Sequence, residues 1–174
     1  MLKIGIIGVG VLGSASKSYY EDDGYDVFYY DKFQNIGSIK DVDKADIIFI
    51  CVPTPRGADN RCDISVVDEA IGYIKAGKTV VIKSTVIPGT TDRLQQKYPY
   101  LELFFNPEFL TAKRAYADFC NPKIQIVGFT SKSRGIINIG PEMLLKILPH
   151  AQYEKIMPAT AAEFFKYFRN CYLA

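Results

Sequence analysis

Short apolar runs alternate with longer, partly polar segments along the chain. The runs are rich in Val, Ile, Phe and Tyr and are bounded by Gly, Pro or charged residues, a pattern typical of strands in a buried sheet. We therefore predict strands at residues 2–7, 25–30, 46–52, 79–85, 101–105, 123–128 and 153–157.

The segments between these runs carry apolar residues at helical spacing. Val67, Ala70, Ile71 and Ile74 fall on one face of a helix at residues 64–76, which Gly77 closes. A regular alternation of strands and helices predicts an α/β fold built on a doubly wound parallel sheet. The other predicted helices are residues 14–20, 90–97, about 133–148 with a break at Pro141, and 158–174, while residues 32–45 read as a polar connection.

A glycine-rich turn follows the first predicted strand directly. Gly8, Gly10 and Gly13 form the pattern G-x-G-x-x-G between a strand and a helix, as at the start of a dinucleotide-binding βαβ unit. We expect Gly8 to allow the tight turn, Gly10 to let a pyrophosphate approach the backbone, and Gly13 to bring helix and sheet close. Val11 and Leu12 would offer N–H groups of the helix N-terminus to the phosphates.

An acidic residue stands at the end of the second predicted strand. A carboxylate at Asp31 would accept hydrogen bonds from the ribose hydroxyls of an adenosine and would repel the 2′-phosphate of NADP, so the sequence predicts NAD as the cofactor. The alternative for Asp31 is a solvated strand end. Thr54, Thr85 and Glu108 also follow apolar strands, and ligands of doubly wound sheets bind beyond the carboxyl ends of the strands.

Size and composition fit one ordinary globular domain. The chain has 174 residues, 48% of them hydrophobic and 23% charged, and a net charge of +2, which suggests neither a nucleic-acid nor a membrane partner. We see no membrane span and no signal peptide. The four cysteines form no C-x-x-C pair, which argues against a zinc or other metal site and favours reduced thiols in a cytoplasmic protein. The cysteines are Cys51, Cys62, Cys120 and Cys171.

Several motifs together resemble one family. In order and spacing, the chain resembles the N-terminal NAD-binding domain of the UDP-glucose/GDP-mannose 6-dehydrogenases, the NAD-dependent nucleotide-sugar dehydrogenases. The matching segments are residues 8–13 (GVGVLG), 51–55 (CVPTP), 83–91 (KSTVIPGTT) and 106–110 (NPEFL), and Ala162-Glu163 followed by Lys166, Asn170 and Leu173-Ala174.

The resemblance implies a four-electron oxidation of a primary alcohol on a nucleotide sugar to a carboxylate, through a cysteine thioester and with two NAD molecules reduced. It implies that Thr54 and Thr85 lie along the cofactor and that Thr85 also helps to hold the catalytic water. It implies that Glu108 assists thioester hydrolysis as an acid/base group. From the residues alone, Glu108 could be a loop acid, and Thr85 a strand-end threonine that bonds its own backbone.

The resemblance also assigns residues to the sugar. Phe109 and Leu110 would offer backbone groups to it, and Lys166 and Asn170 would stabilise the developing oxyanion. Lys166 and Asn170 are i,i+4 on the last predicted helix, so they share a face, and an ammonium and an amide donor suit an alkoxide. The alternative for Lys166 is a solvated helix lysine. Thr160 and Glu163 fit a capping box that would start this helix at Thr160.

Two features depart from the family pattern. The family carries a second glutamate four residues after the first, but Ala112 stands there, and Ala112 cannot share a proton or pair with Lys166. The family's nucleophilic cysteine lies beyond the Lys/Asn helix, and Cys171 is no substitute for it. We therefore expect a cofactor domain at residues 1–157, the start of a connecting helix at 158–174, and no sugar-nucleotide domain in this chain. It would bind NAD without turnover, whereas full-length relatives would form homodimers.

Two other functions stay open at the sequence level. A β-hydroxyacid dehydrogenase would have a similar fold and a Lys/Asn helix, although its glycine-rich substrate motif is not obvious here. A non-catalytic dinucleotide-binding module is the other alternative, and Ala112 favours it slightly.

Overall fold

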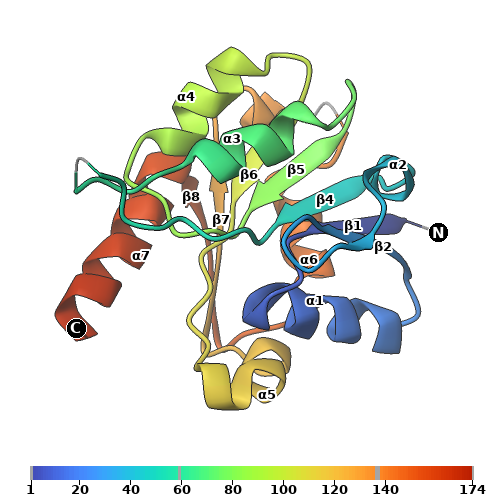
Figure 1. The fold of residues 1–174 in the computed structure, drawn as a ribbon. Helices are drawn as coiled ribbons and strands as arrows, with labels where there is room; N and C mark the ends of the chain where they lie inside the picture. Colours follow the sequence, from blue (N-terminus) through green and yellow to red (C-terminus); the bar gives the residue numbers. More distant parts are fainter. Residues whose placement is uncertain (1, 59, 136–137, 174) are drawn as a thin grey trace.

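The protein forms one eight-stranded sheet with helices on both faces (Figure 1). The computed structural model describes residues 2–58, 60–135 and 138–173. The strands are β1 (Lys3–Ile7), β2 (Asp26–Asp31), β3 (Ile36–Gly37), β4 (Ile47–Ile50), β5 (Thr79–Ile82), β6 (Glu102–Phe105), β7 (Ile124–Phe129) and β8 (Tyr153–Pro158). The helices are α1 (Val11–Asp22), α2 (Ile39–Val42), α3 (Ser65–Gly72), α4 (Thr90–Lys97), α5 (Ala115–Cys120), α6 (Pro141–Ile147) and α7 (Ala159–Leu173), with 3-10 turns at Ala112–Arg114 and Ser133–Gly135.

The strand order confirms the predicted doubly wound arrangement. The order is β3-β2-β1-β4-β5-β6-β7-β8, and β2, β1, β4, β5 and β6 pair in parallel. The chain moves outward from β1 to one side, then returns to β4 and proceeds to the other side. The carboxyl ends of β1 and β4 therefore point to a switch point, where the loops diverge and leave a crevice.

Two strand pairs differ from the prediction of a wholly parallel sheet. β2 pairs with the two-residue β3 in the antiparallel direction, and so does β6 with β7. The connection from β6 to β7 carries only the 3-10 turn at Ala112–Arg114 and the short helix α5, and it stays at the carboxyl end of β6. A strand that begins at the edge where its neighbour ends must run back antiparallel to it.

Helices divide between the two faces of the sheet. One apolar cluster joins the sheet to α2, α3, α4 and α7, and the other joins it to α1, α5 and α6. The central strands β4, β5 and β6 are buried throughout, which explains why, apart from Thr79 and Glu102 at their starts, their residues are consecutively apolar rather than alternating.

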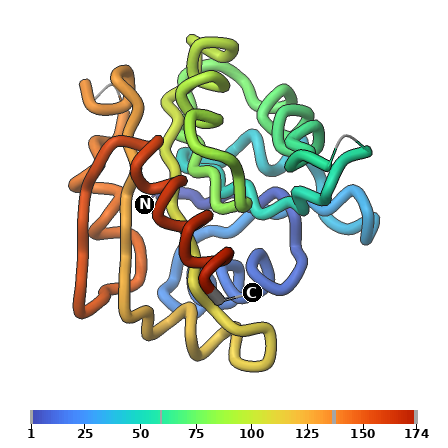
Figure 2. Tube along the Cα trace, turned by 90° about the vertical axis from the view of Figure 1, so that its left-hand side faces the viewer, coloured from blue at the N-terminus to red at the C-terminus, as the bar shows by residue number. Residues whose placement is uncertain are grey.

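The last helix returns across the sheet toward the carboxyl ends of the central strands. Figure 2 shows α7 (red) lying between α4 (yellow-green) and the strands β7 and β8 (orange). Gly128 on β7 permits this approach, because a Cβ there would lie 2.9 Å from both Ala159 Cα and Ala162 Cβ. The close packing fixes where the later residues of α7 arrive, beside the loop that follows β6.

Most predicted elements occur, and α4 has the predicted bounds. The polar connection at 32–45 was incompletely predicted, since it contains β3 and α2, and α5 was missed. The predicted capping box is wrong: α7 begins at Ala159, and Glu163 does not cap it but binds α4 instead. Within the described ranges, no helix combines the length and apolar character needed to cross a membrane.

Candidate functional site

A crevice opens at the switch point between β1 and β4. It has a volume of about 530 Å³ and takes its walls from the carboxyl ends of β1, β2, β4 and β5. The structure brings most of the predicted cofactor residues to it, and Gly13 is the exception. The predicted residues in its lining are Gly8, Gly10, Val11, Leu12, Asp31, Thr54, Thr85 and Glu108.

The three glycines have different surroundings. Gly8 has a φ of 92°, in the left-handed region, as the tight turn requires. A Cβ on Gly13 would lie 1.8 Å from the carbonyl oxygen of Gly8, so only glycine lets α1 start this close to the strand. A Cβ on Gly10 would meet nothing within 4 Å. The predicted structural roles of Gly8 and Gly13 are confirmed, and the space at Gly10 suits the approach of a phosphate.

The carboxylate of Asp31 ties the end of β2 to the glycine turn. Its Oδ2 accepts the N–H of Val9 at 2.7 Å, and its Oδ1 accepts the N–H groups of Phe33 and Gln34, both at 2.9 Å. Burial by itself would raise the pKa of Asp31, but the hydrogen bonds from Gln34, Val9 and Phe33 outweigh it and hold this pKa below its usual value. The side chain is therefore a buried anion at the crevice rather than a solvated strand end.

Gln34 is a residue of this site that the sequence did not reveal. Its Nε2 donates to the carbonyl oxygen of Val9 at 2.8 Å and to Asp31 Oδ2 at 3.3 Å. It lies in the segment that read as a polar connection, and no motif distinguishes it there. Its amide reinforces the link between the glycine turn and β2.

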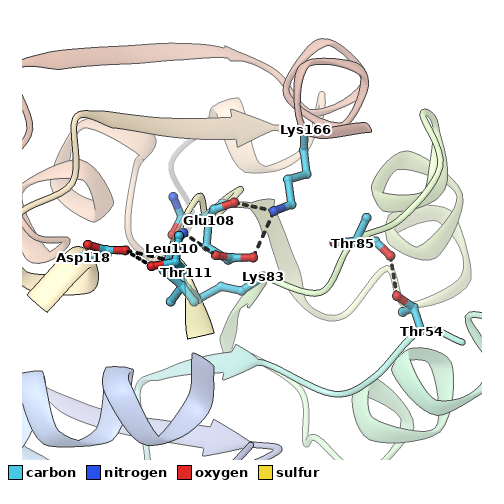
Figure 3. A network of polar contacts seen from close by, with 9 residues as sticks. Thr54, Lys83, Thr85, Glu108, Leu110, Thr111, Asp118 and Lys166 are labelled. Carbon is cyan, nitrogen blue, oxygen red and sulfur yellow. Dashed lines mark hydrogen bonds and ion pairs between the residues drawn. The ribbon is translucent and has the colours of Figure 1, made fainter. Parts of the chain in front are cut away.

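The ends of β4 and β5 are joined by the two predicted threonines. Thr54 Oγ1 donates to the carbonyl oxygen of Thr85 at 2.7 Å (Figure 3). Both threonines line the crevice. The structure thus places Thr54 and Thr85 in one contact, as neighbours along the predicted cofactor path.

Glu108 and Lys166 meet where the loop after β6 faces α7 (Figure 3). Lys166 Nζ lies 2.9 Å from Glu108 Oε1 and also donates to the carbonyl oxygen of Glu108. Glu108 Oε2 accepts the N–H of Leu110 at 2.9 Å. The Lys166 side chain is only 5% exposed, so it is not a solvated helix lysine. Ala112 offers Lys166 no carboxylate, but Glu108 does.

A second cavity of about 550 Å³ lies on the other side of Glu108. Phe109 and Leu110, the predicted sugar contacts, line it. The guanidinium of Arg169 lies 4.4 Å from the ring centroid of Phe109, an interaction that the sequence did not suggest. Asn170 follows Arg169 on α7, and its side chain is exposed.

Lys83 borders both cavities, and the sequence assigned it no role. Its side chain is almost fully buried and donates to Asn106 Oδ1, and Asn106 Nδ2 donates to Gln125 Oε1 at 2.7 Å. Burial lowers the pKa of Lys83 to about 8, with Lys166 acting in the same direction. Lys83 and Glu108 are the two residues common to the linings of both cavities. The residues shared by the two cavities are therefore a lysine and a glutamate.

Comparisons with known proteins agree with this geometry. A family model, described as the NAD binding domain of the UDP-glucose/GDP-mannose dehydrogenase family, matches residues 31–147. The chain is 31% identical over 144 residues to a UDP-glucose 6-dehydrogenase of Pseudomonas aeruginosa, covering 75% of this chain and 31% of that protein. It is 32% identical over 153 residues to a UDP-glucose 6-dehydrogenase of Rickettsia conorii, covering 82% and 34% of the two.

A solved structure has the same fold. The UDP-glucose dehydrogenase of Pyrobaculum islandicum superimposes with a TM-score of 0.84 at 23% identity, over 99% of this chain and 50% of that one. The chain thus spans about half or less of these relatives. The family match favours the nucleotide-sugar dehydrogenase prediction over the β-hydroxyacid dehydrogenase and non-catalytic alternatives. The chain belongs to the UDP-glucose/GDP-mannose dehydrogenase family and carries the NAD-binding domain of that family.

Proposed function

We propose that the chain is the cofactor-binding part of an NAD-dependent nucleotide-sugar 6-dehydrogenase. The substrate would be UDP-glucose or a similar nucleotide sugar, whose primary alcohol is oxidised to a carboxylate. The observation that carries the proposal is the Glu108–Lys166 pair, because Glu108 lines both the dinucleotide crevice and the second cavity and Lys166 binds it from α7. An acid/base group beside a buried ammonium suits the oxidation of an alcohol.

The residues of the crevice fit NAD. The first helical hydrogen bond of α1 runs from Ser14 N–H to Gly10 O, so the N–H groups of Val11, Leu12 and Gly13 precede it and remain available to a pyrophosphate. We propose that Asp31 binds the adenosine ribose, and that Thr54 and Thr85 lie along the nicotinamide half. When bound, NAD would supply the hydride acceptor.

Glu108, Phe109 and Leu110 at the second cavity, with residues of α7, would act on the sugar. Lys166, with Asn170, would stabilise the negative oxygen that develops when the hydroxyl proton is lost. Glu108 would move protons during hydrolysis of the thioester, with the attacking water held by Thr85. Phe109 and Leu110 would place the sugar against this group through their backbone. Over the complete reaction the carbon loses two hydrides, and water supplies the second carboxylate oxygen.

The cysteines support the proposal that these residues bind the cofactor but do not complete the oxidation. Cys51 lines the crevice, but burial raises its pKa to about 12, so its thiol stays protonated and is a poor nucleophile. We propose that residues 1–157 bind the cofactor and that 158–174 begin a connecting helix. These 174 residues would bind NAD without completing the oxidation. All four cysteines are free thiols, which supports a reducing compartment such as the cytoplasm.

We further propose that α7 contributes to a homodimer. Phe164, Phe168 and Tyr172 stack in series at ring-centroid distances of 6.0 and 6.4 Å, and all three are exposed. A row of exposed rings on one helix favours burial against another apolar surface.

The proposed function is tested by measuring cofactor binding and turnover separately. The chain is melted with and without NAD, and then incubated with NAD and UDP-glucose while NADH is followed by absorbance. We expect NAD to raise the melting temperature in a saturable manner and no NADH to form. Absence of any NAD effect would contradict the cofactor role. Sustained NADH formation would contradict the proposal that these residues bind NAD without completing the oxidation.

A further inference from the structure

Glu163 places a fully buried carboxylate between two elements of the site. It lies on α7 and is 0% exposed. Its Oε2 accepts the N–H of Gly89 at 2.6 Å, and its Oε1 accepts the N–H and the hydroxyl of Thr91 at 2.7 and 2.6 Å. All three donors belong to the N-terminus of α4, more than 70 residues earlier in the chain.

The N-terminus of α4 needs such a partner. Its N-cap is Gly89, which has no side chain to accept the first helical N–H groups. The carboxylate of Glu163 supplies the missing acceptor and also places a negative charge at the positive end of the helix. Burial raises the pKa of Glu163 against the opposing effect of its hydrogen bonds from Thr91 and Gly89.

The contacts of α7 continue along the same side of the helix. One turn before Glu163, Thr160 Oγ1 donates to Asp92 Oδ2 at 2.7 Å. One turn after it, Lys166 reaches Glu108. Residues three apart on a helix are neighbours on its surface. Thr160, Glu163 and Lys166 therefore form one line, which binds first α4 and then the loop after β6.

The segment at the other end of these bonds carries a site residue. Gly89 closes the stretch that begins at Thr85, and the carbonyl of Thr85 accepts the hydroxyl of Thr54 at the wall of the crevice. A shift of α4 relative to α7 would change the position of the Thr85 segment relative to Lys166. Glu163 is the buried residue that joins these two segments.

We propose that Glu163 is a positioning residue that holds the Lys166 helix in register with the Thr85 segment. That this relative position matters for catalysis rests on the proposed function. The claim that Glu163 fixes the position of α7 relative to the Thr85 segment does not. In Glu163→Gln, one carboxylate oxygen becomes an amide nitrogen that faces an N–H group of Gly89 or Thr91. Two donors then oppose each other, and the helix must move or rotate to relieve them.

The register is tested by the reactivity of Lys166 in the whole chain without cofactor. Lysines are modified by reductive methylation, and the rate at each site is read by peptide mass mapping. Lys166 is 5% exposed and should react slowly in the wild type. Lys83, directly after β5, is also buried and reports on general loosening of the fold. Thr160→Val removes the exposed bond at the same junction and is the matched control.

We expect Glu163→Gln to raise the Lys166 rate by about fivefold or more, with the Lys83 rate unchanged and Thr160→Val close to the wild type. The proposal is overturned if Lys166 stays protected in Glu163→Gln, or if Lys83 and Lys166 become reactive together. Should Glu163→Gln fail to fold, the comparison is made with Glu163→Asp, which keeps the charge but shortens the reach. Because no cofactor is present, failure of the wild type to bind NAD would count against the proposed function alone.

Discussion

Lys166 on α7 binds the carboxylate of Glu108, 58 residues earlier in the chain, at 2.9 Å between Nζ and Oε1. The two groups come from elements that share no local sequence signal. Glu108 lines both the dinucleotide crevice and the second cavity, so the pair connects the arrangement of the sheet to the chemistry proposed for the site.

The energy of this pair is measurable in a double-mutant cycle. Because the lysine is buried and the glutamate about one-fifth exposed, we expect Lys166→Met and Glu108→Gln each to destabilise the fold, and the two together to cost less than their sum. The coupling energy should be about 1 kcal/mol, measured by denaturant unfolding. Strictly additive effects would show that the contact is unimportant in solution.

A matched pair of glycine variants separates folding from cofactor binding. Gly13→Ala forces a Cβ to within 1.8 Å of a carbonyl oxygen and should destabilise the protein by about 3 kcal/mol or prevent folding. Gly10→Ala places a Cβ in open space, so its melting temperature should match the wild type. Its affinity for NAD should fall by about tenfold, because the added methyl occupies the pyrophosphate path. Unchanged NAD affinity in Gly10→Ala would place the phosphates elsewhere.

Asp31 should make the free energy of unfolding depend on pH in the acid range. The pKa of this carboxyl is lower in the folded protein than in the unfolded chain, so the folded state favours the charged form. Its contribution is complete above the unfolded pKa of about 4 and is lost as the pH falls through the lower folded value. We expect Asp31→Asn to cost about 1–2 kcal/mol at neutral pH, and the difference from the wild type to shrink below about pH 4. A difference that is constant from pH 7 to pH 2 would contradict this description.

Lys83 should make stability rise with pH in the same direction as Asp31 does, but in the alkaline range. Its folded pKa of about 8 lies below the ordinary lysine value, so above that pH the unfolded chain binds more protons than the folded protein. Stability should therefore rise with pH between about 8 and 10.5 in the wild type relative to Lys83→Met. The relative gain should approach about 3 kcal/mol, measured by unfolding at several pH values. Equal pH profiles of the two proteins would show that the ammonium is not buried.

The sequence predicted what local patterns encode. The apolar runs located the strands, the glycines marked the turn after β1, and the bounds of α4 follow from residues 90–97 themselves. Their positions after apolar strands predicted that four polar residues lie in one region, and all four line the crevice: Asp31, Thr54, Thr85 and Glu108. The contact of Lys166 with Glu108 is not local, and no sequence pattern indicated it; the family resemblance only assigned both residues to the same reaction.

The remaining features depend on distant partners. Thr160 and Glu163 match a capping box in the local sequence. In the structure Thr160 donates a hydrogen bond to α4 and Glu163 accepts hydrogen bonds from its N-terminus, because α7 packs on Gly128 and so comes within reach of α4. Lys83 reads as the polar end of a strand, and only the fold buries it. The direction of β7 cannot be read from the periodicity either, since successive side chains point to opposite faces in parallel and antiparallel strands alike.

The central claim is that the crevice between β1 and β4 selects NAD through Asp31. The most direct test is a calorimetric titration of the chain with NAD and then NADP, repeated on Asp31→Ala and on Asp26→Ala, which changes an exposed acid at the opposite end of β2. We predict saturable NAD binding, NADP binding weaker by about tenfold or more, loss of this preference in Asp31→Ala, and its retention in Asp26→Ala. Equal affinity of the wild type for the two cofactors, or no binding of either, would contradict the claim.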